Sequence, residues 1–107
     1  MEPQPDGDQQ VLDQLKKGGS NLSKAHKIDF YLYFPSEENA MAASETLRKE
    51  GLSVEVRTAA IGSDWLCLGR KEMLPKHSEL ARLRQVFHGL AKKLNGEYDG
   101  WETEVVK

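Results

Sequence analysis

Hydrophobic and polar positions alternate without a break from residue 28 to residue 34. One side of an extended chain would carry only apolar residues, namely Ile28, Phe30, Leu32 and Phe34. The other side would carry Asp29, Tyr31 and Tyr33. Because side chains repeat every second residue in a strand, the pattern predicts a β-strand. Aromatic and β-branched residues on both sides favour a central strand that is covered on both faces.

Three further strands are predicted at residues 53–58, 65–70 and 97–105. In the first of these, Val54 and Val56 are expected to face inward. In the second, Leu66 and Leu68 would share one face, and Trp65 and Cys67 the other. The turn signal Gly62-Ser63-Asp64 lies between these two strands and predicts an antiparallel hairpin.

Three stretches have helical spacing. A short helix is predicted at 8–17, where Val11, Leu12 and Leu15 form one apolar stripe. A second helix follows the N-cap residue Ser36 and ends near Gly51. Its inward residues are expected to be Ala40, Met41, Ala43 and Leu47. A third helix, 78–95, carries the clearest stripe, formed by Leu80, Leu83, Phe87, Leu90 and Leu94.

After the first helix, the elements follow the order strand, helix, strand, strand, helix, strand. This order predicts an α+β, ferredoxin-like βαββαβ fold: a four-stranded antiparallel sheet with two helices on one face, plus a short N-terminal helix. The expected strand order across the sheet is fourth, first, third, second. Residues 8–107 are expected to form a single domain, and residues 1–7, with two prolines and a glycine, a flexible N-terminus.

Composition and motifs exclude several classes of function. The 107 residues carry a net charge of −2, which argues against a general nucleic-acid binder. A single cysteine, together with the absence of a signal peptide or an apolar spanning segment, favours a cytoplasmic protein without a membrane anchor. No phosphate-binding loop, CxxC or nucleophile motif occurs, and the three histidines are too scattered to share a metal. We therefore expect neither an enzyme nor a cofactor.

A cluster of aromatic side chains is predicted on the sheet face away from the two main helices. Alternation would place Tyr31, Tyr33, Trp65 and Cys67 there, with Asp99 and Trp101 on the adjoining edge strand. In one interpretation the N-terminal helix folds over this face and forms a second small core. In the other, the face stays open and stacks the bases of single-stranded RNA.

Charge is unevenly distributed near the end of the chain. Residues 76–95 hold five basic residues against one acid, whereas residues 97–107 hold four acids against one lysine. Two interpretations remain open: ordinary solvated surfaces, or a polarised surface that steers a charged protein partner.

Two stretches resemble a known family. Residues 96–103, Gly-Glu-Tyr-Asp-Gly-Trp-Glu-Thr, resemble the closing motif of the regulator of ribonuclease E activity B (RraB) family. Residues 19–24, Gly-Ser-Asn-Leu-Ser-Lys, followed by the alternating strand, resemble its opening. The resemblance covers about residues 9–105 and implies a ferredoxin-like, cofactor-free inhibitor protein that binds the non-catalytic scaffold half of ribonuclease E.

The resemblance suggests a partner-binding site on the last strand, at Tyr98, Asp99, Trp101, Glu102 and Glu104. A structural role for the same motif is the alternative, with Gly100 permitting a bulge and Trp101 filling a core. Well-known members continue into a long acidic tail, which this sequence lacks after Lys107. If such a tail captures a basic partner segment, this chain is expected to bind it more weakly or to bind a different partner. The rival functions are single-stranded RNA binding on Tyr31, Tyr33 and Trp65, and a small-ligand sensor.

Overall fold

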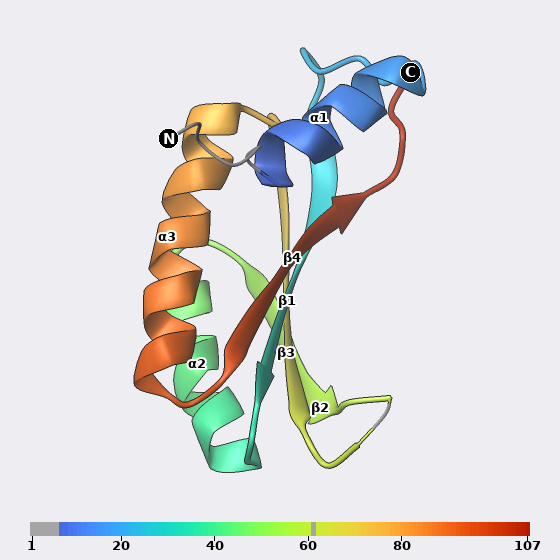
Figure 1. Ribbon diagram of the computed structural model, residues 1–107. Helices are drawn as coiled ribbons and strands as arrows, with labels where there is room; N and C mark the ends of the chain where they lie inside the picture. The colour runs from blue at the N-terminus through green and yellow to red at the C-terminus, as the bar shows by residue number, and fades with distance from the viewer. Residues whose placement is uncertain (1–6, 61) are drawn as a thin grey trace, which may run out of the picture.

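The alternating stretch is the centre of the sheet, as the sequence predicts. A computed structural model describes residues 7–60 and 62–107, and in it strand β1 (His26–Phe34) pairs antiparallel with a neighbour on each side (Figure 1). The other strands are β2 (Ser53–Thr58), β3 (Trp65–Met73) and β4 (Glu97–Thr103). The helices are α1 (Gly7–Lys17), α2 (Glu37–Lys49) and α3 (His77–Lys93).

The sheet has the order β2-β3-β1-β4 and every pairing is antiparallel. This confirms the βαββαβ architecture and the predicted strand order. Helices α2 and α3 pack side by side on one face of the sheet (Figure 1). The opposite face is therefore the one that can meet another molecule.

The core lies between β1 and the two main helices. The apolar side of β1 is fully buried, and the ring of Phe30 packs edge-on against Phe87 of α3 at 5.4 Å between centroids. On α2, Ala40, Ala43 and Leu47 are buried as predicted. Met41 was expected to face inward but is 48% exposed, because it lies beyond the edge of the buried stripe.

Helix ends follow the local sequence signals. The Ser36 hydroxyl accepts a hydrogen bond from the Asn39 amide at 3.2 Å, which satisfies one free donor at the start of α2. After α3, Asn95 adopts a left-handed conformation (φ 60°), and the Gly96 amide donates to the Ala91 carbonyl at 2.8 Å. These contacts turn the chain directly from α3 into β4.

The prediction for the two faces of β3 was wrong. Phe34 pairs with Trp65 and Leu32 with Cys67, so Trp65 and Cys67 lie on the helix-covered face. Gly69 lies on the same face, where a Cβ atom would collide with leucine side chains beneath α2. Leu66 and Leu68 instead pair with Tyr33 and Tyr31 on the opposite face. Trp65 therefore does not belong to the predicted aromatic face.

Of the two interpretations of the aromatic face, the one in which the N-terminal helix folds over it does not agree with the structure. Helix α1 contacts α3 and β4, and lies across the upper end of the sheet, running away from the top of α3 (Figure 1). Its buried Leu12 and Leu15 join the main core instead of forming a second one. The helix begins at Gly7; the rest of the segment expected to be flexible, residues 1–6, lies outside the described residues.

Candidate protein-binding face

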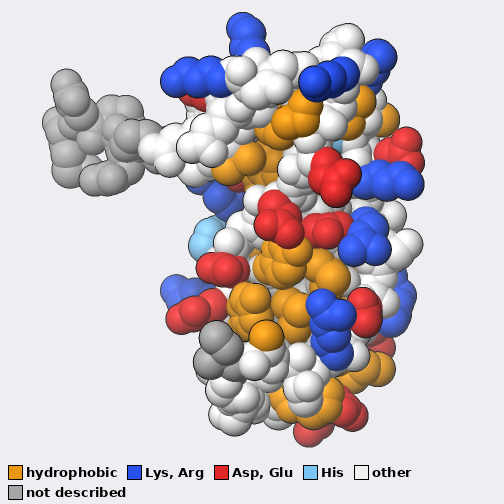
Figure 2. All heavy atoms as spheres, turned by 90° about the vertical axis from the view of Figure 1, so that its right-hand side faces the viewer, with side chains coloured by type: hydrophobic (Ala, Val, Ile, Leu, Met, Phe, Trp, Pro, Cys, Tyr) orange, Lys and Arg blue, Asp and Glu red, His pale blue; other side chains and the backbone are white. Residues whose placement is uncertain are grey.

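We call the sheet surface opposite α2 and α3 the open face. By strand register it carries side chains from all four strands. Its ring and aliphatic members are Tyr31 and Tyr33 of β1 and Leu66 and Leu68 of β3. Figure 2 looks onto this side of the molecule and shows an apolar centre bordered by charged side chains. The two leucines are buried between the tyrosines and the β2 side chains, so the tyrosines form the accessible ring surface.

The open face is rich in carboxylates. The register places five there: Asp29, Glu55, Glu72, Glu97 and Glu102. It places three basic side chains: Lys27, Arg57 and Arg70. Asp99 and Glu104 border the hollows on this side and raise the acids to seven, an excess of four. This side of the sheet is therefore far more acidic than the chain as a whole.

Two of the three basic side chains already have partners. The Arg70 guanidinium donates to both carboxylate oxygens of Asp29, at 2.6 and 3.3 Å, and this hydrogen bond raises the pKa of Arg70. The Arg57 guanidinium donates to Glu55 at 3.5 Å. Since these pairs are internally neutral, the remaining field comes chiefly from the acids along β4.

Tyr31 and Glu102 are joined across the β1–β4 seam. The Tyr31 hydroxyl donates to Glu102 Oε1 at 2.6 Å. This hydrogen bond, together with partial burial and the nearby negative charge, raises the pKa of Tyr31 to about 12. The hydroxyl therefore stays a donor throughout the physiological pH range, and the tyrosine ring is held in place beside the carboxylate.

A bulge in β4 opens a hollow beside this pair. The pairing register shifts between Tyr31 and Leu32, and Gly100 has φ +98°, a conformation that glycine adopts readily. A Cβ atom on Gly100 would meet nothing within 4 Å. The hollow, of about 340 Å³, is lined by Tyr31, Tyr33 and residues 99–102. Its only charged lining groups among the described residues are Asp99 and Glu102.

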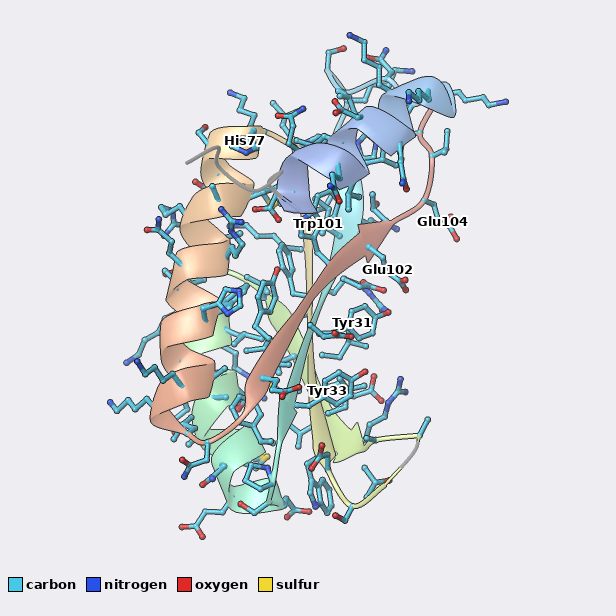
Figure 3. The ribbon with its side chains drawn as sticks, in the orientation of Figure 1. Tyr31, Tyr33, His77, Trp101, Glu102 and Glu104 are labelled. Atoms are coloured by element: carbon cyan, nitrogen blue, oxygen red, sulfur yellow. The ribbon has the colours of Figure 1, made fainter. Side chains whose placement is uncertain are left out.

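The structure separates the five predicted partner-binding residues into two groups. Asp99, Glu102 and Glu104 are exposed. In Figure 3, Glu102 and Glu104 point away from the helix layer, on the same side as Tyr31 and Tyr33. Tyr98 pairs with Leu32 and Trp101 with Phe30, so both rings lie on the helix-covered side.

The two inward-facing aromatic residues of β4, partly buried Tyr98 and buried Trp101, join β4 to the helices. The Tyr98 ring packs against Phe87 and His88, at 5.5 and 5.2 Å between centroids, and burial raises its pKa. Trp101 is 7% exposed, and its indole Nε1 donates to the Asp8 carboxylate of α1 at 2.8 Å. The other oxygen of that carboxylate lies 3.3 Å from Arg84 Nε of α3. The motif thus docks α1 onto β4 and α3.

The polar connector before β1 meets the end of the chain. His26 is fully buried, and its Nε2 lies 2.6 Å from the Ser20 hydroxyl oxygen, which also accepts from the Val106 amide at 3.0 Å. The segment after β4 is thereby held beside β1, and a groove of about 730 Å³ runs between them, past Lys27 and Glu104. Sequence patterns gave no signal for this long-range contact.

These features define a class of protein. The described residues contain no group of three potential metal-binding side chains, and no described helix is long and apolar enough to cross a membrane. The uncovered acidic sheet face is typical of a module that binds another macromolecule. A family model named regulator of ribonuclease activity B (RraB) matches residues 6–103, and the chain belongs to this family. A comparison with curated proteins finds no match.

Family membership confirms the functional class predicted from the two motifs. Proteins of the RraB family are non-enzymatic regulators that bind ribonuclease E. The chain is accordingly a regulator of ribonuclease E activity. The surface that carries out this binding has to be argued from the geometry of the molecule.

Proposed function

We propose that the protein regulates ribonuclease E by binding it through the open face and the adjoining β4 edge. The observation that carries this proposal is that, within residues 7–60 and 62–107, no helix covers this face, although it holds two accessible tyrosines and an excess of carboxylates. Patches of this kind, with rings at the centre and charges around them, are favoured at protein interfaces.

Within this interface, the exposed members of the predicted set make the contact. Asp99, Glu102 and Glu104 supply the charge, and Tyr31 and Tyr33 supply ring surface. Tyr98 and Trp101 act indirectly, because their rings fix β4 against the helix layer. Their replacement is expected to weaken binding only as far as it disturbs the fold.

Stacking of single-stranded RNA on the same face is less well supported. The acidic surplus repels phosphates, and Trp65 lies on the other side of the sheet, so the ring platform is smaller than the sequence suggested. No specific observation favours a small-ligand sensor.

The regulator is expected to meet the scaffold half of ribonuclease E in the cytoplasm.

The test is a binding measurement with separately purified catalytic and scaffold halves of ribonuclease E. The double variant Asp99→Lys/Glu102→Lys reverses two charges on the open face. The matched control, Glu38→Lys/Glu45→Lys, makes the same charge change at exposed positions of α2, on the helix side. Thermal unfolding of both variants verifies that they fold.

The open-face variant should bind the scaffold half at least about tenfold more weakly, since each reversed charge is worth on the order of 1 kcal/mol. The control should bind like the unmodified protein, and the difference should shrink as salt is added. Equal affinities for the two variants would contradict the proposed surface. Binding to the catalytic half alone would contradict the proposed partner region.

A further inference from the structure

The hollow beside the β4 bulge suggests what kind of partner segment the open face receives. We infer that it accepts an arginine side chain from a basic peptide segment lying along the β1–β4 seam. This inference rests on the proposed function, since it concerns the same surface, and it adds the chemistry of the occupant.

The lining of the hollow matches a guanidinium group. The residues that line it include two tyrosines, Tyr31 and Tyr33, and two acids, Asp99 and Glu102. Guanidinium groups stack on aromatic faces and donate several hydrogen bonds in one plane to carboxylates. Glu102 uses one oxygen, Oε1, for Tyr31, which leaves Oε2 available to an incoming donor.

No internal cation occupies this role among the described residues. Arg57 is paired with Glu55, and Arg70 is paired with Asp29, the cross-strand neighbour of Glu102; neither arginine lines the hollow. Asp99 and Glu102 form no ion pair with any described side chain. Charge complementarity therefore calls for a basic group from outside the chain, and it disfavours a nucleic-acid phosphate at the same position.

The bulge explains why a long side chain fits there. Gly100 presents no side chain, and the space above it is open, so the floor of the hollow is backbone. The Tyr31 hydroxyl is tied to Glu102 and does not need to move when the hollow fills. A preformed site of this kind loses little conformational entropy on binding.

The experiment uses the full chain labelled with ¹⁵N and a peptide of alternating glycine and arginine. Matched peptides carry lysine or citrulline, the neutral analogue of arginine, in place of every arginine, and oligouridine serves as the nucleic-acid probe. We expect the amide signals of Tyr31, Tyr33, Gly100 and Glu102 to shift with the arginine peptide. The lysine peptide should bind more weakly, and the citrulline peptide should cause no shift.

Conservative variants test the individual groups. Asp99→Asn and Glu102→Gln should each lower the affinity for the arginine peptide about two- to fivefold, as for an exposed ion pair. Tyr33→Leu, which keeps an apolar side chain without a π face, should also lower it. Glu45→Gln on α2 is the control and should have no effect.

Four outcomes would overturn the inference: no binding of the arginine peptide, equal shifts with the citrulline peptide, shifts confined to other surfaces, or shifts with oligouridine and none with arginine. Failure here can be told apart from failure of the proposed function. If the arginine peptide does not bind but Asp99→Lys/Glu102→Lys still abolishes ribonuclease E binding, only the arginine site is refuted. If the peptide fills the hollow but the charge reversal leaves the affinity for ribonuclease E unchanged, only the proposed function is refuted.

Discussion

Replacement of Trp101 by phenylalanine tests whether the closing motif stabilises the fold. The change removes the indole Nε1 that donates to Asp8 at 2.8 Å, a hydrogen bond between residues that are 7% and 4% exposed. A hydrogen bond to a charged group contributes about 1.5–3 kcal/mol. The smaller ring also leaves a cavity that costs on the order of 1 kcal/mol. We therefore expect Trp101→Phe to lower the free energy of unfolding by about 2–4 kcal/mol.

The loss should be felt first in α1. An isolated helix of 11 residues is marginal in water, so α1 depends on its contacts with β4 and α3. Amide hydrogen exchange in α1 should accelerate more than exchange in β1. At about 4 °C per kcal/mol for a chain of this size, the melting temperature should fall by roughly 8–16 °C.

Urea denaturation of a double-mutant cycle isolates the hydrogen bond. The cycle compares the unmodified protein with Trp101→Phe, Asp8→Ala and the double variant. A coupling energy of about 1–3 kcal/mol is expected for residues in direct contact. Trp65→Phe is the matched control, because the Trp65 indole is half-buried and makes no hydrogen bond to the described residues.

Two results would refute this reasoning. The first is additive behaviour of Trp101→Phe and Asp8→Ala within about 0.5 kcal/mol, which would mean that the two side chains do not interact energetically. The second is a loss of stability in Trp65→Phe as large as in Trp101→Phe. Unfolding would then report only the smaller ring and not the hydrogen bond.

Three further predictions concern single positions. Gly96→Ala should destabilise the protein by about 3 kcal/mol or more in urea titrations, because its Cβ atom would collide with the backbone of β1; Gly89→Ala, exposed on α3 with open space around it, should instead stabilise it by roughly 0.5–1 kcal/mol. Burial raises the pKa of the Cys67 thiol from 9.0 to about 11, so Ellman's reagent should react at pH 8 only after unfolding. Because the folded state keeps that proton longer, stability should fall as pH rises from about 9 to about 11; a native thiol that reacts at pH 8 as fast as the unfolded one would show that it is accessible. Glu102→Gln should lower the pKa of Tyr31 from about 12 toward 10.0 in NMR titrations, since the neutral amide no longer opposes the phenolate; an unchanged value would exclude the Glu102 hydrogen bond as its cause.

Local patterns were sufficient to predict the architecture. The alternation in β1 and the cap at Ser36 each depend on neighbouring residues, and both appear in the structure as predicted. The strand order expected for this succession of elements places the two most hydrophobic strands in the centre, and the structure has this order. The family motifs added the function, which periodicity could not supply.

The prediction of which β3 side chains face the helices was wrong because hydrophobicity alone was used to choose the inner side. Leucine is the more typical core residue, yet both faces of a central strand can be apolar. Gly69 was the better signal, since a residue without a side chain marks the place where Leu47 and Leu52 approach the strand. Gly69, Cys67 and Trp65 share one face of β3. Assigning that face to the helix side would have identified the open face correctly.

The candidate site depends on contacts that no local pattern contains. The hydrogen bond from Trp101 to Asp8 spans 93 positions, and the one from Tyr31 to Glu102 spans 71. The first decides where α1 docks, and so whether the open face is covered. The composition of the exposed patch was predictable in part, but its accessibility was not.

The glycine bulge in β4 also changes the alternation of side chains between the two faces of the sheet. Tyr98 and Trp101 are three positions apart, so in a regular strand they would point in opposite directions. Here the inserted residue lets both rings enter the same layer, with Tyr98 against α3 and Trp101 hydrogen-bonded to Asp8 of α1, while Glu97 and Glu102 remain in contact with solvent. A regular strand with the same three-residue spacing would turn one of the two rings out into water. The Glu-Tyr-Asp-Gly-Trp motif therefore contains a break in the two-residue periodicity of the strand. The spacing between its two aromatic residues matters for the fold as much as their identity does.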